Sequence, residues 1–333
     1  MGFPPVDRSD RGKLMKAAVY DVEGAPGVLQ YVDVPDPVAG PDDVLISVEA
    51  ISIEGGDLIN RRSTSPPLPS WIVGYAAAGT VVAVGSKVRS RKVGDRVTAF
   101  SMQGSHAERW AVPAERTWLI PDGVDAADAA VVPISFGTAH HCLFARGMLR
   151  RGETVLIQAA AGGVGLAAVQ LASHAGTRGI AVASGAQQRG RLLELGADHV
   201  VDRVENNVVD SVREYTRGAG VDLVIDPVGT TLPDSLAALA PEGRLVFVGN
   251  AGGGGLTVDL WPPMQSNQTL MGVFMGPLFE RPDVRTSVDE MLQSVAEGRL
   301  RVVIDRVFPL ANAAVAHDYA ETAKPLGRIV MKP

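Results

Sequence analysis

The sequence is poor in the residues that build covalently linked or metal-held folds. Its 333 residues include one cysteine, Cys142, which excludes an intrachain disulfide and a zinc site of several cysteines. Aromatic residues make up only 5% of the chain, and no apolar run is long enough to cross a membrane. A single thiol is typical of the reducing cytoplasm, which is the location we expect.

An excess of positive charge is also absent. Lys and Arg number 31 against 37 Asp and Glu, which gives a formal net charge of −6. This balance argues against nucleic acid or an anionic membrane as the main partner. The length allows two domains, and the 46% hydrophobic content is ordinary for a globular protein. We therefore expect small-molecule chemistry, with no nucleic acid and no membrane as partner.

The pattern of predicted secondary structure changes once along the chain. Residues 1–14 lack the apolar core of a signal peptide, and we expect a flexible extension with the fold starting near Met15. From residue 16 to about 122, short β-like runs alternate with Gly, Pro and Asp turns, a pattern typical of a β-barrel. From residue 126 onward, helices and strands alternate, which predicts a doubly wound parallel sheet.

The predicted elements follow this division. Strands of the first part are expected at 16–20, 43–53, 78–84, 95–99 and 107–112. Strands of the second part are expected at 154–158, 180–183, 199–202, 221–226, 244–249 and 269–275, and helices at 165–175, 187–195, 208–216 and 233–239. The remaining chain, with a helix near 284–297, a strand near 306–308, a helix near 311–319 and a last strand at 327–331, is too short for its own core. We expect it to pack back on the first domain.

One segment, residues 155–172, carries most of the functional information. It is typical of a buried strand, a glycine-rich turn and an apolar helix, and the turn fits a dinucleotide fingerprint as Ala160-x-Gly162-x-x-Gly165. Missing or minimal side chains let the backbone approach a diphosphate, and free amides at the helix start face its charge. A lone fingerprint is weak evidence, but here the flanking strand and helix supply the context that it requires. The residues expected at the diphosphate are Ala161, Gly162, Gly163 and Val164.

The end of the second strand indicates which dinucleotide binds. NAD-specific proteins place an acidic residue there for the ribose 2′-hydroxyl, but residues 184–191 contain no carboxylate. Ser184 can donate to a 2′-phosphate, and Arg189 can pair with it bidentately. We therefore predict NADPH as cofactor. The alternative is that Arg189 is a solvated residue on the first turn of a helix.

Several segments together make the order of parts recognisable. With the glycine turn, they are residues 74–85, 93–97, 104–108, 152–157, 195–202 and 220–229. On these segments the chain resembles the zinc-free quinone oxidoreductase (zeta-crystallin-like) branch of the medium-chain dehydrogenase/reductase superfamily, over nearly the whole length from Met15.

The resemblance implies an α/β protein with two domains and a cleft between them. A GroES-like β-barrel catalytic domain would comprise residues 15–124 with 277–333, and a Rossmann NADP-binding domain residues 125–276. It also implies a homodimer formed through the sixth strand of the cofactor domain. Further cofactor contacts are implied at Thr138 beside the carboxamide, Arg203 on the adenosine side, Val228 at the nicotinamide ribose, and Gly249 with Asn250.

Zinc-dependent members of the superfamily carry Cys-His-x-Asp and Gly-His-Glu motifs that supply metal ligands. The matching places here are Glu54-Gly55-Gly56-Asp57 and Gly74-Tyr75-Ala76, and the six histidines show no metal-ligand spacing. The Tyr-x-x-x-Lys pair of short-chain reductases is absent at all five tyrosines. We therefore expect no metal, and neither zinc alcohol chemistry nor short-chain reductase chemistry.

Without a metal, the acceptor must stabilise the arriving electrons by itself, as a quinone or an α,β-unsaturated carbonyl does. The protein then positions the reactants and donates hydrogen bonds to the oxygen that gains charge. Quinone oxidoreductases of this type often carry Asn where Glu54 stands and Tyr near Ile59-Asn60, and both are replaced here. Glu54, Asn60 and Tyr75 are the candidates for the altered lining, although each of them has a structural alternative.

The predicted function is an NADPH-dependent, metal-free reductase of a quinone or of the activated C=C of an α,β-unsaturated carbonyl. One alternative is an enoyl-thioester reductase, related to the enoyl reductase domains of polyketide synthases. Another is a non-catalytic NADPH-binding protein, which the missing Asn and Tyr would support. The sequence leaves these alternatives open.

Overall fold

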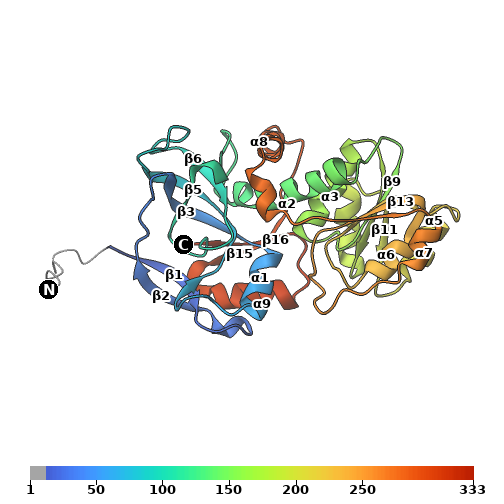
Figure 1. Ribbon diagram of the computed structural model, residues 1–333, viewed down its shortest axis with the longest axis horizontal. Coiled ribbons are helices and arrows are strands. Elements are labelled where there is room, and N and C mark those ends of the chain that lie inside the picture. The colour runs from blue at the N-terminus through green and yellow to red at the C-terminus, as the bar shows by residue number, and fades with distance from the viewer. Residues whose placement is uncertain (1–12) are drawn as a thin grey trace.

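The computed structural model describes residues 13–333, so residues 1–12 of the expected extension lie outside the described residues. The first strand begins at Leu14, within the predicted extension and just before the expected start of the fold. The chain forms two lobes side by side, and the C-terminus lies in the same lobe as the N-terminal strands (Figure 1). No helix in this part of the chain is both long and apolar enough to cross a membrane.

The first lobe is built from two sheets, of which the smaller is antiparallel and the larger is mixed, because β15 pairs parallel with β16. The smaller sheet has the strand order β2-β1-β4, and the larger has the order β15-β16-β3-β5-β6-β8, with β7 paired to β3. The strands are β1 (Leu14–Tyr20), β2 (Gln30–Pro35), β3 (Asp43–Ile53), β4 (Trp71–Ile72), β5 (Ala76–Val84), β6 (Arg96–Phe100), β7 (Arg109–Pro113), β8 (Thr117–Leu119), β15 (Ile304–Pro309) and β16 (Arg328–Lys332). The last strand, β16, pairs antiparallel with β3, which brings the C-terminal segment into this lobe.

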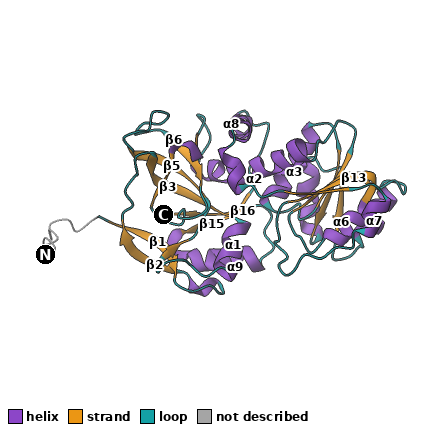
Figure 2. Cartoon of the chain, viewed as in Figure 1, coloured by secondary structure: helices purple, strands orange, loops and turns teal. Residues whose placement is uncertain are grey.

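The second lobe is a parallel six-stranded sheet of order β11-β10-β9-β12-β13-β14. In chain order this is the 3-2-1-4-5-6 arrangement of the Rossmann fold, so the predicted doubly wound sheet is confirmed. Its strands are β9 (Thr154–Ile157), β10 (Arg178–Ala183), β11 (His199–Asp202), β12 (Val221–Asp226), β13 (Leu239–Phe247) and β14 (Thr269–Gly272). Its helices, which flank the strands in Figure 2, are α3 (Gly163–His174), α4 (Arg189–Glu194), α5 (Val208–Tyr215), α6 (Leu232–Ala238) and α7 (Trp261–Gln265).

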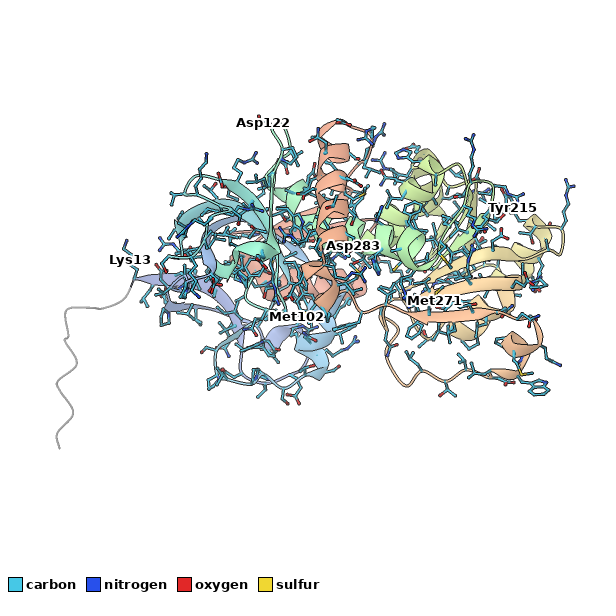
Figure 3. The ribbon with its side chains drawn as sticks, turned by 45° about the horizontal axis from the view of Figure 1, so that its top comes forward. Lys13, Met102, Asp122, Tyr215, Met271 and Asp283 are labelled. Atoms are coloured by element: carbon cyan, nitrogen blue, oxygen red, sulfur yellow. The ribbon has the colours of Figure 1, made fainter. Side chains whose placement is uncertain are left out.

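Helix α2 (Ala126–His140) joins the two lobes. It packs on β3, β5 and β6 of the barrel and on α3 of the second lobe, and it is apolar around most of its surface, as a buried helix must be. Helix α8 (Pro282–Ala296) packs against α2, and Figure 3 labels Asp283 on its first turn, between the lobes. Gly137 permits this approach, because a Cβ there would lie 2.9 Å from a methyl group of Val288. One hydrophobic core therefore extends through both lobes.

Some elements differ from the sequence predictions. The fifth Rossmann strand begins at Leu239 rather than at 244, because a register shift against β12 absorbs the turn-like Pro241 and Gly243. The sixth strand ends at Gly272 rather than at 275, since its last partner on β13 is Phe247. Other elements that no sequence pattern predicted include β2, β4, β8, α1 (Gly55–Ser63) and α7, whereas the helix predicted near 311–319 is present as α9 (Ala313–Thr322).

Helix α1 matters most among these elements, because it contains Asn60 and follows directly after Glu54, two of the predicted lining residues. Two glycines at its start disfavour a helix by intrinsic propensity, so the sequence did not indicate one. The backbone amide of Glu54 donates to the Asp57 carboxylate at 2.8 Å and so satisfies the start of the helix.

Candidate active site and cofactor cradle

The glycine turn between β9 and α3 leaves the first main-chain amides of α3 without a hydrogen-bond partner among the described residues. Gly162 precedes the first residue of α3, and no side chain caps the helix. A Cβ on Gly162 would meet nothing closer than 3.4 Å, whereas a Cβ on Gly165 would lie 2.4 Å from the carbonyl oxygen of Ala159. Gly165 is therefore required by the close approach of helix and strand, and Gly162 leaves room for a diphosphate.

At the next strand end, Ser184 and Arg203 come together. Arg203, which follows β11, donates from Nε to the Ser184 hydroxyl at 2.7 Å. The Asp202 carboxylate is engaged by the backbone amides of Gly185 and Val204, each at 3.0 Å. A hydroxyl and a guanidinium therefore stand where an NAD-specific site would place a carboxylate.

Arg189 is not hydrogen-bonded to this pair. No hydrogen bond or ion pair joins it to Ser184 within residues 13–333. Its charge instead acts on His199, whose pKa is lowered first by burial and then by Arg189. The buried Gln188 donates to the carbonyl oxygen of Lys324 at 3.1 Å, which brings the loop before β16 to this edge of the site. No sequence pattern indicates that this loop lies beside Gln188.

The glycine turn, the Ser184–Arg203 pair and the loops after β12 and β13 together form what we call the cofactor cradle. The loops after β12 and β13 meet at the end of it opposite the Ser184–Arg203 pair. A Cβ on Gly229 would lie 2.6 Å from the side-chain oxygen of Asn250, and one on Gly249 would lie 2.8 Å from the carbonyl oxygen of Pro227. The loops that carry Val228 and Asn250 therefore lie side by side.

Asp226 organises this loop, and sequence reasoning missed it. The buried carboxylate accepts hydrogen bonds from the amides of Val228 and Gly229, at 2.8 and 3.0 Å, on one oxygen. Its other oxygen accepts from the hydroxyls of Thr231 and Ser235, each at 2.7 Å. Its position as the polar end of an apolar strand was the available signal.

Glu54 is almost fully buried and forms an ion pair with Arg328 of β16. Its other oxygen accepts from the Ser52 hydroxyl at 2.6 Å. Burial lowers the pKa of Arg328 to about 9. Arg328 was not predicted either, although a basic residue directly before the apolar run 329–331 was a signal that could have been used.

Arg328 also lies against the glycine turn. A Cβ on Gly163 would be 2.4 Å both from Cδ of Arg328 and from the hydroxyl of Ser135 on α2. The Ser135 hydroxyl and Nε of Arg328 are buried and have no hydrogen-bond partner among the described residues. Thr138 follows Ser135 by three residues and so lies on the same side of α2. Unpaired polar atoms beside an open glycine turn fit a polar ligand such as a dinucleotide.

Asn60 and Tyr75 are in direct contact. The Asn60 side-chain amide donates to the Tyr75 hydroxyl at 2.7 Å. Burial, followed by the charge of Asp57, raises the pKa of Tyr75 to about 12. Asp57 itself is fully buried with one oxygen unpaired, and desolvation raises its pKa well above the usual range. The structure thus brings two of the three predicted lining residues together and places Glu54 in a separate ion pair.

No cluster of three or more His, Cys, Asp or Glu side chains within residues 13–333 could hold a metal ion. Two buried histidines, His106 and His317, do face each other, with their Nε2 atoms 3.0 Å apart. They lie between the barrel and α9 and have no third ligand of this kind beside them.

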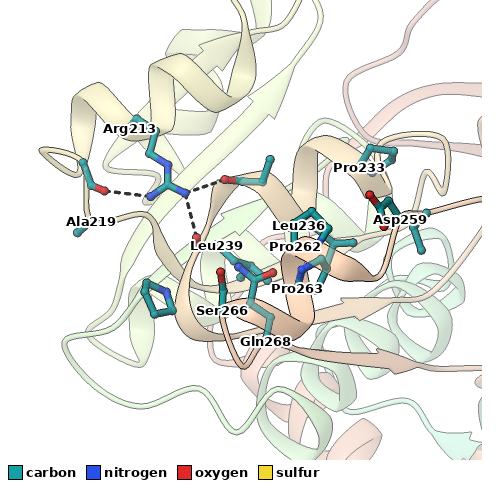
Figure 4. Close-up of a pocket in the computed structure, with 14 residues that line it drawn as sticks. Arg213, Ala219, Pro233, Leu236, Leu239, Asp259, Pro262, Pro263, Ser266 and Gln268 are labelled. Atoms are coloured by element: carbon teal, nitrogen blue, oxygen red, sulfur yellow. Dashed lines mark hydrogen bonds between the residues drawn. The ribbon is translucent and has the colours of Figure 1, made fainter.

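A hollow of about 720 Å³ lies elsewhere, on the outer side of the second lobe, and is lined by residues such as Leu236, Pro262 and Gln268 (Figure 4). Its cationic residue, Arg213, is already bonded to the main-chain carbonyls of Gly218, Ala237 and Leu239, at 2.8–3.1 Å. The hollow is remote from the glycine turn, and its guanidinium is not available to an anionic ligand. We therefore do not assign the chemistry to it.

Comparison with known proteins agrees with this geometry. Residues 40–122 match the alcohol dehydrogenase GroES-like domain, and residues 163–294 match the zinc-binding dehydrogenase family. The chain is 34% identical to a quinone oxidoreductase of Pseudomonas aeruginosa over 96% of its length and 100% of the relative. It is 30% identical to a 2-haloacrylate reductase of Burkholderia sp, over 96% and 99% of the two chains.

A solved structure gives the same result. The Escherichia coli quinone oxidoreductase complexed with NADPH superimposes with a TM-score of 0.90 at 28% identity, covering 96% of this chain and 100% of that one. The name of the second family model refers to zinc, but the two matching motifs in this chain contain Glu54 and Tyr75 instead of Cys and His. The chain belongs to the zinc-free quinone oxidoreductase branch of the medium-chain dehydrogenase/reductase superfamily.

Proposed function

We propose that this protein reduces a quinone, or the activated C=C of an α,β-unsaturated carbonyl, with NADPH and without a metal. The chain is an NADPH-dependent oxidoreductase. The observation that carries the proposal is the cradle itself: an open glycine turn whose adenosine end offers Ser184 and Arg203 in place of a carboxylate. A 2′-phosphate is matched by a hydroxyl donor and a guanidinium, and a carboxylate would repel it.

The proposed cofactor contacts follow the cradle from end to end. NADPH, when bound, supplies the hydride. The main-chain amides of the glycine turn hold the diphosphate, and Ser184 with Arg203 holds the 2′-phosphate, with Arg189 as a further cation at that edge. The residues proposed at the diphosphate and the nicotinamide are Ala161, Gly162, Gly163, Val164, Thr138, Val228, Gly249 and Asn250. The Asp226 hydrogen bonds support this assignment, because they fix the loop that carries Val228.

On the acceptor side, we propose that Asn60 and Tyr75 line the pocket. Glu54 acts through another residue: its carboxylate balances the buried charge of Arg328 beside the glycine turn. A buried guanidinium without such a partner would be strongly unfavourable. Glu54 is therefore a positioning residue in this proposal, and its direct contact with substrate stays a sequence prediction.

The domain division and the assembly belong to the same proposal. Residues 15–124 with 277–333 form the catalytic domain, and residues 125–276 form the cofactor domain. A homodimer through β14 is supported by that strand's place at the edge of the sheet, where Figure 3 labels Met271. The exposed apolar side chains of Trp261 and Phe274, 62% and 70% accessible, lie on segments next to this strand in the chain. A cytoplasmic location is supported by the single buried cysteine, Cys142.

The test is to mix purified protein with NADPH or NADH and follow the absorbance of the reduced nicotinamide with quinones, enones and enoyl thioesters. We expect faster oxidation of NADPH than of NADH with at least one of these classes. Oxidation with enoyl thioesters alone would favour the polyketide-type alternative. Saturable NADPH binding with no oxidation by any acceptor would replace the proposal with a non-catalytic NADPH-binding protein.

A further inference from the structure

The ring of Tyr75 is held from two sides. A Cβ on Gly56 would lie 2.3 Å from the ring, so Tyr75 packs directly against the first turn of α1. On another side, the ring meets Phe100 edge to face, with centroids 6.2 Å apart and an interplanar angle of 79°. Phe100 in turn packs on Phe279, with ring centroids 4.4 Å apart. Such packing fixes the direction of the phenolic C–O bond.

The hydroxyl of Tyr75 accepts one hydrogen bond but donates none to the described residues. It accepts a hydrogen bond from Asn60 at 2.7 Å, but no group within residues 13–333 accepts its own proton. Tyr319 is a useful contrast, because its hydroxyl donates to the Asp305 carboxylate at 2.8 Å. A hydroxyl that accepts one hydrogen bond becomes a stronger donor in the next, so Asn60 prepares Tyr75 to donate.

The hydroxyl also keeps its proton over the whole physiological range. Burial and the charge of Asp57 raise the pKa of Tyr75 to about 12. A phenol with this pKa is a hydrogen-bond donor near neutral pH, and it is too weak an acid to lose its proton to solvent.

We propose that Tyr75 donates a hydrogen bond to the carbonyl oxygen of the acceptor and that Asn60 orients it for this role. The inference rests on the proposed function and adds the group that replaces the metal: Tyr75 stands in the motif where zinc-dependent members of the superfamily carry a metal ligand. The acceptor class it selects is a conjugated C=C bearing a carbonyl oxygen.

Hydride adds to the β-carbon, the C=C electron pair moves to form the enolate, and negative charge collects on the carbonyl oxygen. The Tyr75 hydroxyl stabilises that oxygen without transferring its proton, and water supplies a proton to the α-carbon. The overall change is acceptor plus NADPH plus H⁺ giving reduced acceptor plus NADP⁺. A donor aimed at developing charge of this kind typically contributes about 10²–10³ in kcat.

The first test is Tyr75→Phe, which removes one oxygen and keeps the ring against Gly56 and Phe100. We expect kcat with an enone to fall about 100-fold, while the Kd for NADPH stays at its wild-type value. The loss should be smaller with an electron-poor quinone, because its reduced oxygen is less basic and gains less from the hydrogen bond. Thermal unfolding shows that the variant is folded.

The second test is Asn60→Asp, a change of nearly equal size that reverses the polarity of the contact. A carboxylate accepts the Tyr75 proton and so removes it from the substrate, and we expect a loss of kcat close to that of Tyr75→Phe. The double variant should be no slower than either single variant, since both remove the same hydrogen bond.

The outcomes separate this inference from the function on which it rests. An unchanged kcat in folded Tyr75→Phe, a rise in KM alone, or a weakening of NADPH binding as large as the loss of kcat would each overturn the role of Tyr75 while wild-type activity stands. A wild-type protein that oxidises NADPH with no acceptor would instead overturn the proposed function.

Discussion

The two sides of the proposed cleft use different chemical groups: main-chain amides on the cofactor side and polar side chains on the acceptor side. On the cofactor side, the key groups are main-chain amides at the glycine turn and in the loop that Asp226 holds. On the acceptor side, they are buried polar side chains: Glu54 with Arg328, and Asn60 with Tyr75. A main-chain site depends on the local path of one segment, whereas a side-chain site depends on residues that only the fold brings together.

The largest expected effect concerns the acceptor side. Glu54→Gln leaves Arg328 buried without its partner, and we expect a loss of about 3–5 kcal/mol in the free energy of unfolding, measured by denaturant titration. The double variant Glu54→Gln/Arg328→Met removes both charges and should recover most of that stability. If the single variant loses less than about 1 kcal/mol, the acceptor side does not depend on this pair.

The cofactor side offers a matched pair of glycines. Gly165→Ala places a Cβ 2.4 Å from a backbone oxygen, and we expect about 1–3 kcal/mol of destabilisation, seen as a lower Tm. Gly162→Ala meets nothing closer than 3.4 Å, so its Tm should stay near wild type while NADPH binding weakens, because the methyl group occupies the space for the diphosphate. Equal effects of the two variants on Tm and on Kd would contradict the division between packing and binding.

The buried histidine pair predicts a pH dependence in the barrel lobe. Burial lowers the pKa of His106 to about 3 and holds that of His317 well below its usual range. Below about pH 6.5 the two histidines bind protons in the unfolded chain but not in the folded protein. The free energy of unfolding therefore decreases as the pH is lowered, and it continues to decrease towards pH 3. At pH 5 the cost from His106 alone is about 2 kcal/mol.

Denaturant titrations at pH 7 and pH 5 check this expectation against His106→Gln. The variant should lose less stability over that interval than the wild type does. Parallel losses in the two proteins would mean that other groups cause the acid sensitivity.

The smallest expected effect is on cofactor choice. Arg203→Leu removes the guanidinium beside Ser184, and we expect about a 10-fold weaker Kd for NADPH, equivalent to about 1.4 kcal/mol, with NADH binding unchanged. Arg189→Leu is the comparison, and a smaller effect is expected because Ser184 is hydrogen-bonded to Arg203 and not to Arg189. Nicotinamide fluorescence measures both constants. If Arg189→Leu weakens NADPH binding more than Arg203→Leu does, Arg189 rather than Arg203 is the main partner of the 2′-phosphate.

The same division explains how far the sequence could be interpreted. The glycine turn, the parallel strands and the missing acidic residue all lie in contiguous segments, and the predicted Rossmann sheet is present with its expected strand order. Short barrel elements such as β4 and β8 were missed, because strands of two or three residues have no periodicity. Helix α1 was missed because its capping, rather than its propensity, sets where it starts.

The sequence alone therefore determined the fold class, the cradle for the dinucleotide and the lack of zinc ligands, since each depends on residue types at short, fixed spacing. Only the tertiary structure decided the partners of the polar residues. It paired Glu54 with Arg328 across more than 270 positions of sequence, aimed Asn60 at Tyr75, and joined Arg203 rather than Arg189 to Ser184. The physical reason is that a buried polar group takes whichever partner the packing of distant strands and helices brings within hydrogen-bond distance, and no local pattern records that choice.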